Sequence, residues 1–353
     1  MAYTTINKST DYFNTKLYTG TGSNGNAITG VGFQPDFLWI KDRINAYSHR
    51  LYDAVRGVNS ALNSDNTAVA DQYASYGQLT SFDSDGFTVG QGSSSGAAMN
   101  DSGDGHASWN WKAGTTGSGT TTGSGTGKAY SYSVNTTAGF SIVKYIGNGT
   151  AGHTIPHHLG TTPHFIIVKG IDLAEEWETY HHAIGNNISL KVNNTNTGDT
   201  GAGRWNSTTP TSTVFSVGNA NATNQDTKNF IAYCFAEKVG YSKFGKYTGN
   251  GNADGTFVYT GFKPAFVIIK RTDSTNNWGL FDNKRNSSNP VNKLILPNSS
   301  NAEDGNNTRI DMYSNGFKPR VNDPLENASG GTHIYMAFGQ SLVGSNNVPC
   351  TAR

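Results

Sequence analysis

The chain has 353 residues, of which 14% are charged, 11% are aromatic and 43 are glycine. This many aromatic residues can build hydrophobic cores, which excludes a disordered chain. The abundance of Gly, Asn, Thr and Ser suits short strands joined by turns, not a helical bundle, a coiled coil or a collagen. The formal net charge is +1, so we expect no basic face for nucleic acid.

The N-terminal segment, MAYTTINKSTDYFN, lacks the basic and then apolar regions of a secretory signal peptide. No apolar run approaches the ~18 residues of a membrane-spanning helix, so we expect no membrane insertion. If the protein works outside a cell, it must leave by another route, such as lysis of a host that releases virus particles. We assign residues 1–11 to an N-terminal arm.

Five short sequence blocks follow one another in the same order three times along the chain. The second block is GFQPDFLWIKDR at 32–43, and it reappears as GTTPHFIIVKGI at 160–171 and as GFKPAFVIIKRT at 261–272. Repetition in a fixed order indicates tandem structural units, which we place at 12–113, 139–239 and 240–344. The aligned positions in this block are Pro35, Pro163 and Pro264; Phe37, Phe165 and Phe266; and Lys41, Lys169 and Lys270.

Each unit is predicted to consist of β-strands. In the last block, HASWNWKAG at 106–114, large side chains at Trp109 and Trp111 alternate with smaller ones, and the other two copies keep this alternation. A period of two is typical of a strand with one face on a core. The runs FLWIK, FIIVK and FVIIK are apolar on both faces, which favours central strands covered on both sides.

These patterns predict an all-β fold of three tandem β-sandwich repeats, jelly-roll or immunoglobulin-like, with less than about a tenth of the chain helical. The strand order stays open. We expect the aligned Phe residues to lie in the core of their own unit and the aligned Lys residues to end equivalent strands. Asp85-Gly86 and Asn315-Gly316 are dipeptides of tight hairpin turns.

The units are joined in two different ways. Residues 114–138 form a Gly/Ser/Thr-rich linker that would be a flexible coil in isolation, and we expect the units or neighbouring chains to hold it. The second and third units are joined almost directly through KVGYSKF, so we expect them to pack on each other. Residues 345–353 form a C-terminal arm, and we expect one or both arms to dock on a neighbouring chain.

Two acidic segments and a group of histidines contain side chains of the types that bind metal ions. DSDG at 83–86 resembles the start of a calcium loop but lacks its remainder, so we expect a hairpin turn, and AEDGNN at 302–307 is expected to be a polar loop. The histidines of the second unit lie where the other copies have none, without Cys or carboxylate at ligand spacing, so we favour turn and surface positions for them. We predict neither a metal nor another cofactor. These histidines are His153, His157, His158, His164, His181 and His182.

We expect a non-enzymatic protein with no catalytic residues. The sequence has no HExxH motif and no Cys–His constellation, and its acidic residues do not recur at one place in all three copies, although a glycosidase carboxylate pair stays open. Glycan binding is an alternative, because exposed aromatic faces with Asn and Asp bind sugars. The candidates are Trp205 in GAGRWNSTTP and the aligned pair Trp177 and Trp278, and core packing is the competing interpretation for all three.

The segments MAYTTINKSTDYFNTKLYTGTG, GVGFQPDFLWIKDR, NFIAYCFAEK and GSNNVPCTAR resemble uncharacterised repeat proteins of tailed bacteriophages. Such proteins occur in marine and cyanobacterial phage genomes and are described as virion or tail-fibre-like. The resemblance covers nearly the whole chain and implies concanavalin-like or jelly-roll sandwiches without catalytic residues. The C-terminal end departs from the ATAR-type ending of the family through Cys350.

We therefore expect a structural protein on the outside of a phage virion, in a tail fibre or receptor-binding assembly that contacts the host cell surface. A head-decoration or head-fibre protein is the first alternative, and a free carbohydrate-binding module is the second. The expected partners are other virion proteins, copies of the chain itself and host surface glycans. The expected location is the virion surface, after assembly in the host cytoplasm and release by lysis.

Overall fold

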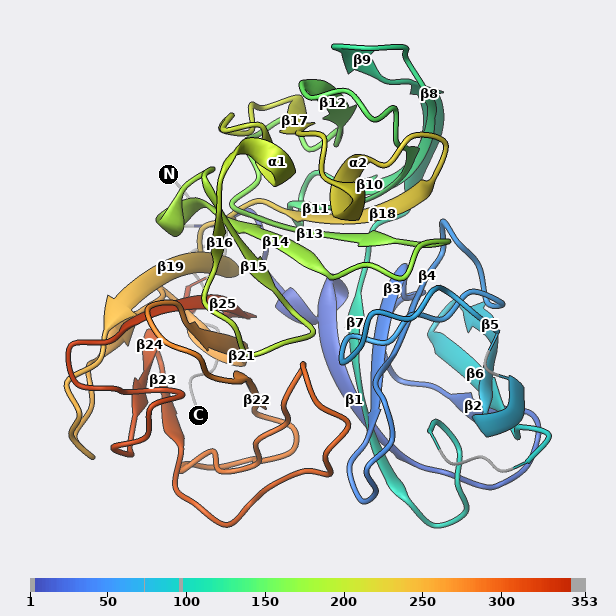
Figure 1. Cartoon of the computed structure of the whole chain (residues 1–353). Helices are drawn as coiled ribbons and strands as arrows, with labels where there is room; N and C mark the ends of the chain where they lie inside the picture. The colour runs from blue at the N-terminus through green and yellow to red at the C-terminus, as the bar shows by residue number, and fades with distance from the viewer. Residues whose placement is uncertain (1–3, 73, 95–97, 344–353) are drawn as a thin grey trace.

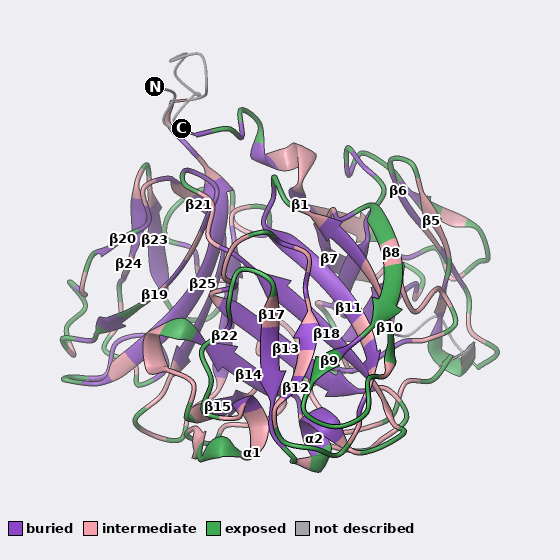
Figure 2. Cartoon of the chain, turned by 90° about the horizontal axis from the view of Figure 1, so that it is seen from above, coloured by how far each residue is buried: buried purple, intermediate pink, exposed green. Residues whose placement is uncertain are grey.

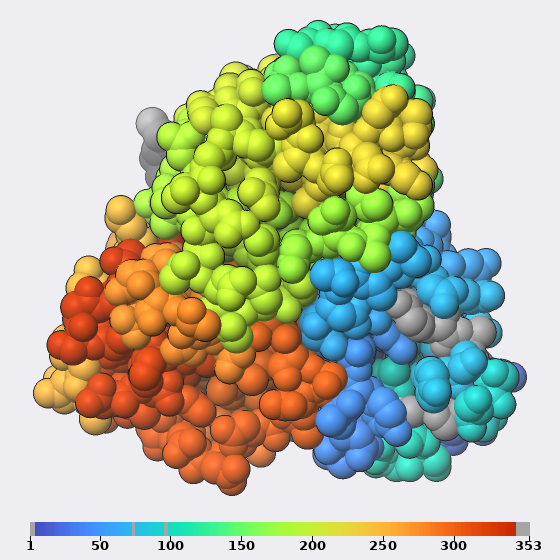
Figure 3. Space-filling model, viewed as in Figure 1, coloured from blue at the N-terminus to red at the C-terminus, as the bar shows by residue number. Residues whose placement is uncertain are grey.

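The protein folds into antiparallel β-sheets arranged in three lobes, in a computed structural model that describes residues 4–72, 74–94 and 98–343. Strands make up 42% of the chain and helices 5%, so the predicted all-β class is confirmed. Lobe 1 spans residues 13–111, lobe 2 spans 115–235 and lobe 3 spans 242–340. The three lobes lie around a common centre (Figure 1) and touch one another on the face shown in Figure 3.

Lobe 1 contains a four-stranded and a three-stranded sheet. The larger sheet has the order β1 (Phe13–Thr19), β7 (Gly105–Trp111), β3 (Phe37–Asp42) and β4 (Arg50–Asp53). The smaller sheet has the order β2 (Asn26–Ile28), β6 (Gly86–Gly90) and β5 (Gln78–Asp83). Two short 3₁₀ helices, η1 (Ser9–Asp11) and η2 (Ala74–Tyr76), lie before and between these strands.

Lobe 2 contains an eight-stranded sheet and a three-stranded sheet. The larger sheet has the order β16 (Asp199–Thr200), β15 (Ile188–Lys191), β14 (Glu178–His181), β13 (Phe165–Gly170), β18 (Asn229–Phe235), β11 (Phe140–Ile146), β10 (Ala129–Asn135) and β8 (Thr115–Thr120). The smaller sheet has the order β17 (Val214–Val217), β12 (His153–Pro156) and β9 (Thr122–Gly123). Its helices are η3 (His182–Ile184), α1 (Ala202–Trp205) and α2 (Asn221–Asn224).

Lobe 3 again pairs a four-stranded sheet with a three-stranded sheet. The larger sheet has the order β19 (Ser242–Thr248), β25 (Thr332–Gln340), β21 (Lys263–Arg271) and β22 (Trp278–Asp282). The smaller sheet has the order β20 (Val258–Tyr259), β24 (Gly316–Pro319) and β23 (Ile310–Tyr313).

The central strands of the three lobes pair in matching registers. Phe37 of β3 lies opposite Trp111 of β7, Phe165 of β13 lies opposite Phe235 of β18, and Phe266 of β21 lies opposite Phe338 of β25. The sequence alignment of the second and last blocks therefore corresponds to a real pairing of strands in each lobe.

The central strands are buried on both faces, as the apolar runs predict, but the two faces meet different cores. Along β3, Leu38 and Ile40 point into a core that belongs to lobe 1 alone, whereas Phe37 and Trp39 point into a core that all three lobes share. The alternation follows from the period of two along a strand. Figure 2 shows these strands as the buried middle of the molecule.

The prediction that the aligned Phe residues lie in separate unit cores is therefore wrong. Phe37 stacks on Tyr233 of lobe 2 with ring centres 4.2 Å apart, and Phe266 of lobe 3 lies 5.2 Å from Phe13 and 5.5 Å from Trp111 of lobe 1. The period of two shows that a face is buried, but it does not show whether the same lobe or another lobe covers that face.

The aligned lysines stand next to last in equivalent strands, as predicted, and their side chains are fully buried. Lys41 Nζ donates to the carbonyl oxygens of Asp42 and Asn45 at 2.6 and 3.1 Å, and Lys169 Nζ donates to those of Gly170 and Leu173 at 2.8 and 3.0 Å. Each ammonium group thus holds the turn after its strand. Burial lowers the pKa of Lys41, Lys169 and Lys270 to about 8.

The Gly/Ser/Thr-rich linker at 114–138 forms strands of lobe 2. Within it, β8 and β10 extend the sheet beyond β11. The rings of Tyr130 and Tyr132 cross Gly119 and Gly117 so closely that a Cβ at either glycine would lie 2.8 or 2.6 Å from a tyrosine hydroxyl. The glycines that suggest a flexible coil are therefore what allows the tyrosines to pack across the outermost strand.

Two further expectations concern the hairpins and the arms. Hairpins form near both predicted dipeptides, but their two-residue loops are Ser84-Asp85 and Ser314-Asn315, one residue earlier than expected. The described part of the N-terminal arm packs on its own chain, because Ile6 is buried in the shared core and Ser9 N donates to Gln340 Oε1 at 2.7 Å. The C-terminal arm, 345–353, lies outside the described residues.

Within the described ranges, no helix has the length and apolar character needed to cross a bilayer.

Candidate functional site

The lobes are joined by ring N–H groups that reach backbone carbonyls of a neighbouring lobe. Trp177 Nε1 of lobe 2 donates to Asn63 O of lobe 1 at 2.9 Å, and Trp278 Nε1 of lobe 3 donates to Lys191 O of lobe 2 at 2.8 Å. His49 holds the same position in lobe 1, and its Nε2 lies 3.0 Å from Leu296 O of lobe 3. The three contacts form a closed cycle around the molecule.

A second cycle runs in the opposite direction from the ends of β4, β14 and β22. Asp53 accepts a hydrogen bond from Tyr233 Oη of lobe 2 at 2.8 Å, and Asp282 accepts one from Trp109 Nε1 of lobe 1 at 3.0 Å. His181 Nε2 completes the cycle 3.2 Å from Tyr335 O of lobe 3. Polar groups at one position of each lobe therefore hold the shared core together at its margin.

The two acidic residues of this cycle, Asp53 and Asp282, also form buried ion pairs with an arginine three residues later. Arg56 Nε lies 2.5 Å from Asp53 Oδ2, and Arg285 Nε lies 2.6 Å from Asp282 Oδ2. The Arg285 guanidinium lies over the Trp109 ring of lobe 1, 5.5 Å from its centre, which is a cation–π geometry. Each pair therefore acts across a lobe boundary.

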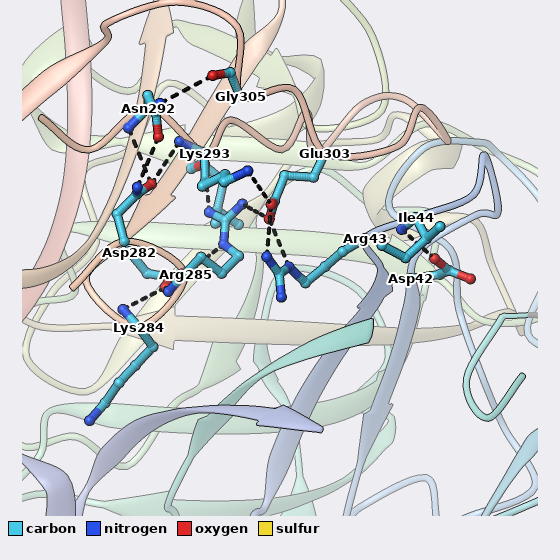
Figure 4. Close-up of polar contacts among 12 residues, drawn as sticks. Asp42, Arg43, Ile44, Asp282, Lys284, Arg285, Asn292, Lys293, Glu303 and Gly305 are labelled. Carbon is cyan, nitrogen blue, oxygen red and sulfur yellow. Dashed lines mark hydrogen bonds and ion pairs between the residues drawn. The ribbon is translucent and has the colours of Figure 1, made fainter. Parts of the chain in front are cut away.

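Glu303 is the centre of a buried ionic cluster at the boundary of lobes 1 and 3 (Figure 4). Its carboxylate accepts two hydrogen bonds from Arg43 of lobe 1, both at 2.8 Å, and one from Arg285 at 3.1 Å, and Lys293 Nζ lies 3.6 Å away. Burial acts to raise the pKa of Glu303, but hydrogen bonds and charge from Arg43 and Arg285 outweigh it and hold that pKa below its usual value.

This cluster corrects the prediction for AEDGNN at 302–307. The segment contains a buried carboxylate that links two lobes, with a side chain only 6% exposed, and is not merely a solvated polar loop. No signal in the sequence could have shown this, because Arg43 lies 260 residues away from Glu303.

A polar cleft of about 270 Å³ lies in lobe 3 beside this segment. Arg309 lines it and pairs with Asp304 at 3.3 Å, Asp323 at 3.1 Å and the buried Glu326 at 3.4 Å. Burial raises the pKa of Glu326 to about 8. Amide, carboxylate and guanidinium groups line the cleft together with leucine side chains, which is a donor and acceptor set suited to a polyhydroxyl ligand. Its lining includes Asn276, Asn277, Asn301, Asp304, Arg309 and Asp323.

A family model described as a domain of unknown function, DUF7483, matches residues 8–341. The chain belongs to this family. A comparison with curated proteins finds no match, and a comparison with solved structures finds none either. The DUF7483 match covers all three lobes, so the family model describes the whole arrangement and not one lobe.

None of the three tryptophans predicted for glycan binding in this DUF7483 chain has an exposed ring. Trp177 and Trp278 are 1% and 2% exposed and belong to the cycle of inter-lobe contacts. Trp205 is 2% exposed and packs edge-on against Tyr180 in the core of lobe 2. Stacking on a sugar needs an open ring face, so these residues do not carry a glycan site, although Asn276 and Asn277 beside Trp278 line the cleft of lobe 3.

The expectation of turn and surface positions is wrong for three histidines, His153, His157 and His181, which are fully buried. His153 has structural partners instead, because its ring nitrogens lie 2.9 Å from Asn224 Oδ1 and 2.6 Å from Thr121 Oγ1. Burial lowers the pKa of His157 to about 4 and that of His181 to about 3. Among the residues that the structure describes, no group of three or more His, Cys, Asp or Glu is placed to hold a metal ion.

Proposed function

We propose that this DUF7483 chain is a non-enzymatic structural protein of a bacteriophage virion, exposed on the particle in a tail-fibre or receptor-binding assembly. The observation that carries the proposal is the matching register of three sheets around one shared core. An assembly protein needs a rigid body of this kind, in which interior side chains are used for cohesion.

We further propose that the lobes are three tandem repeats of one β-sandwich. Support comes from the strand orders: β1-β7-β3-β4 in lobe 1 and β19-β25-β21-β22 in lobe 3 correspond to β11-β18-β13-β14 within the sheet of lobe 2. The aligned Phe and Lys residues occupy equivalent places in these sheets. On this reading, lobe 2 differs by strands added at both edges of its sheet.

The non-enzymatic role is supported by how the interior charges are used. The ion pairs of Asp53 with Arg56, of Asp282 with Arg285 and of Glu303 with Arg43 each lie at a lobe boundary and are nearly or fully buried on the carboxylate side. A catalytic carboxylate must reach a substrate, whereas these groups are occupied by neighbouring lobes.

Labelling of purified particles tests the proposed role. An antibody raised against the recombinant protein is applied to particles of the phage that encodes it, and gold label is located by electron microscopy. We expect label on the tail fibres or at the tail tip. Label over the head would favour the head-decoration alternative, and absence of the protein from purified particles would overturn the virion assignment.

Carbohydrate binding is a second candidate, and the cleft of lobe 3 is the observation that favours it. Asn277 and Asn301 line this cleft beside charged groups that can bind sugar hydroxyls. A glycan array with the full chain should show binding that the double variant Asn277→Ala/Asn301→Ala loses. The exposed Asn219→Ala in lobe 2 serves as the matched control. Equal binding by all three proteins would exclude the cleft.

A further inference from the structure

The outermost strand of the eight-stranded sheet, β8, has a free edge at the margin of the molecule (Figure 1). Its residues 115–120 pair with β10 on one side, and the described part of the chain places no strand on the other side. Five of its six residues are exposed. Open edges of this kind are templates for pairing with another chain, and natural proteins usually protect them.

The large sheets of lobes 1 and 3 end two strand positions earlier on this side, and their edge strands carry protection against this hazard. The edge strands β1 and β19 of lobes 1 and 3 carry Lys16, Lys243 and Lys246, and an edge lysine is a common protection against pairing. In contrast, β8 has the sequence TTGSGT, with no charge and no proline. Its edge therefore lacks the side chains that would oppose pairing.

The alternation of hydrogen bonds along β8 shows which groups face outward. Thr121 N donates to Lys128 O at 2.8 Å in the register that continues the β8–β10 pairing. Because bonded and non-bonded positions alternate in an antiparallel pair, Gly117 and Gly119 bond toward β10. The N–H and C=O groups of Thr116, Ser118 and Thr120 consequently point away from β10, toward the open edge of the sheet.

We propose that β8 pairs with β8 of a second copy of this chain around a twofold axis at Ser118. The segment TGSGT at 116–120 reads the same in both directions, so an antiparallel pair centred on Ser118 places Thr116 opposite Thr120 of the other copy. Ser118 then lies opposite itself. These are the very residues whose backbone groups point outward, so about six hydrogen bonds form without any change of register.

The side chains and charge of β8 also fit this occupant. A twofold pair places residues against the same segment of the other copy, so any charge would meet a like charge. The uncharged β8 avoids this, and its Thr and Ser side chains can form cross-strand hydroxyl pairs on the outer face. The two lobe 2 sheets then continue into each other across the interface. The inference does not depend on the proposed virion role.

Oligomeric mass tests the pairing with the full chain. Light scattering after size exclusion, over a dilution series, should show a species of twice the 37.7 kDa chain mass. Ser118→Lys should give the monomer, because two ammonium groups would meet at the axis. Ser118→Pro should also give the monomer, because it removes an N–H that points away from β10 and leaves the protomer's own sheet intact.

The control is Ser212→Lys, which adds the same charge at an exposed loop of lobe 2 and should stay dimeric. A β-rich circular dichroism spectrum and a cooperative thermal transition of the Ser118 variants establish that they are folded, even if loss of the dimer lowers the transition temperature. A monomeric parent protein at every concentration, or a dimer that survives both Ser118 variants, would overturn the proposal.

A cross-linking variant tests the register itself. In a Cys350→Ser background, where Cys234 is buried, Ser118→Cys should form an intermolecular disulfide on mild oxidation. Directly opposed residues of an antiparallel bonded pair lie about 5.5 Å apart at Cα, within the range of a disulfide. Ser212→Cys should not cross-link. A Ser118→Cys protein that stays monomeric on a reducing-agent-free gel would contradict a twofold axis at Ser118.

Discussion

At the scale of single residues, three buried lysines hold the ends of the central strands. Each is fully buried, and their ammonium groups donate to backbone carbonyls, as Lys169 does to Gly170 and Leu173. Burying an ammonium group in this way costs free energy when it is charged. The lysines therefore link the stability of the fold to pH.

We predict that the free energy of unfolding rises between pH 8 and pH 9.5. The pKa of Lys169 is lowered to about 8 by burial, from 10.5, so in this window the unfolded chain keeps a proton that the native protein has lost. Stability then increases with pH. Lys169→Met should reduce the slope by about 1 kcal/mol per pH unit, measured by urea unfolding. The surface variant Lys8→Met should keep the parent slope, and an unchanged slope in Lys169→Met would contradict the prediction.

Glu303 is the second residue whose replacement should be costly. We predict that Glu303→Gln lowers the free energy of unfolding at pH 7 by about 3 kcal/mol, because it leaves the guanidinium groups of Arg43 and Arg285 at the lobe boundary without this carboxylate. Urea unfolding measures the loss. Glu237→Gln, which breaks the more exposed pair with Lys243, is the control and should cost less than about 1 kcal/mol.

The dependence of the free energy of unfolding on pH below 4.5 provides an independent check on Glu303. Its pKa is held below the ordinary value of 4.5, so its contribution is present above that pH and is lost as the pH falls through the lower native pKa. The parent protein should therefore lose more stability below pH 4.5 than Glu303→Gln does. An equal loss of unfolding free energy below pH 4.5 in the two proteins would show that the carboxylate is not stabilised by its partners.

At the scale of elements, the Gly/Ser/Thr-rich segment 114–138 forms ordered strands of lobe 2 and not a flexible linker. Because β10 is bonded to β8 on one side and to β11 on the other, we predict that amides of residues 129–135 are protected in hydrogen–deuterium exchange. A synthetic peptide of residues 114–138 gives the unprotected reference rates. Exchange of the segment in the protein at peptide rates would contradict the strand assignment.

At the scale of the whole molecule, the shared core should make the three lobes unfold together. Phe266 of lobe 3 contacts Phe13 and Trp111 of lobe 1, so Phe266→Ala should destabilise the entire fold by about 3–5 kcal/mol. Circular dichroism and tryptophan fluorescence should report one transition at one lowered temperature. Phe257→Ala, at a ring that is 45% exposed in the same lobe, should change little. Separate transitions would indicate lobes that fold independently.

The sequence by itself determined the central strands of the three lobes. Alternation of large and small residues in the block at 106–114 located β7, and the doubly apolar run FLWIK located β3, because the period of a strand is local and independent of what covers it. The repeated order of blocks also placed equivalent residues: Phe37 pairs with Trp111 as Phe165 pairs with Phe235. Local chemistry was sufficient to locate these strands and to align their residues across the lobes, but it left the order of the strands in the sheets open.

Only the tertiary structure decided what the buried faces meet. The same apolar pattern puts Leu38 into the core of lobe 1 and Phe37 into the shared core, and it buries Trp177 at a carbonyl of another lobe. Glu303 finds Arg43 across 260 residues of sequence. A sequence pattern shows that a side chain avoids water, but the identity of its partner depends on how the sheets close around one another, and that closure is a property of the whole chain.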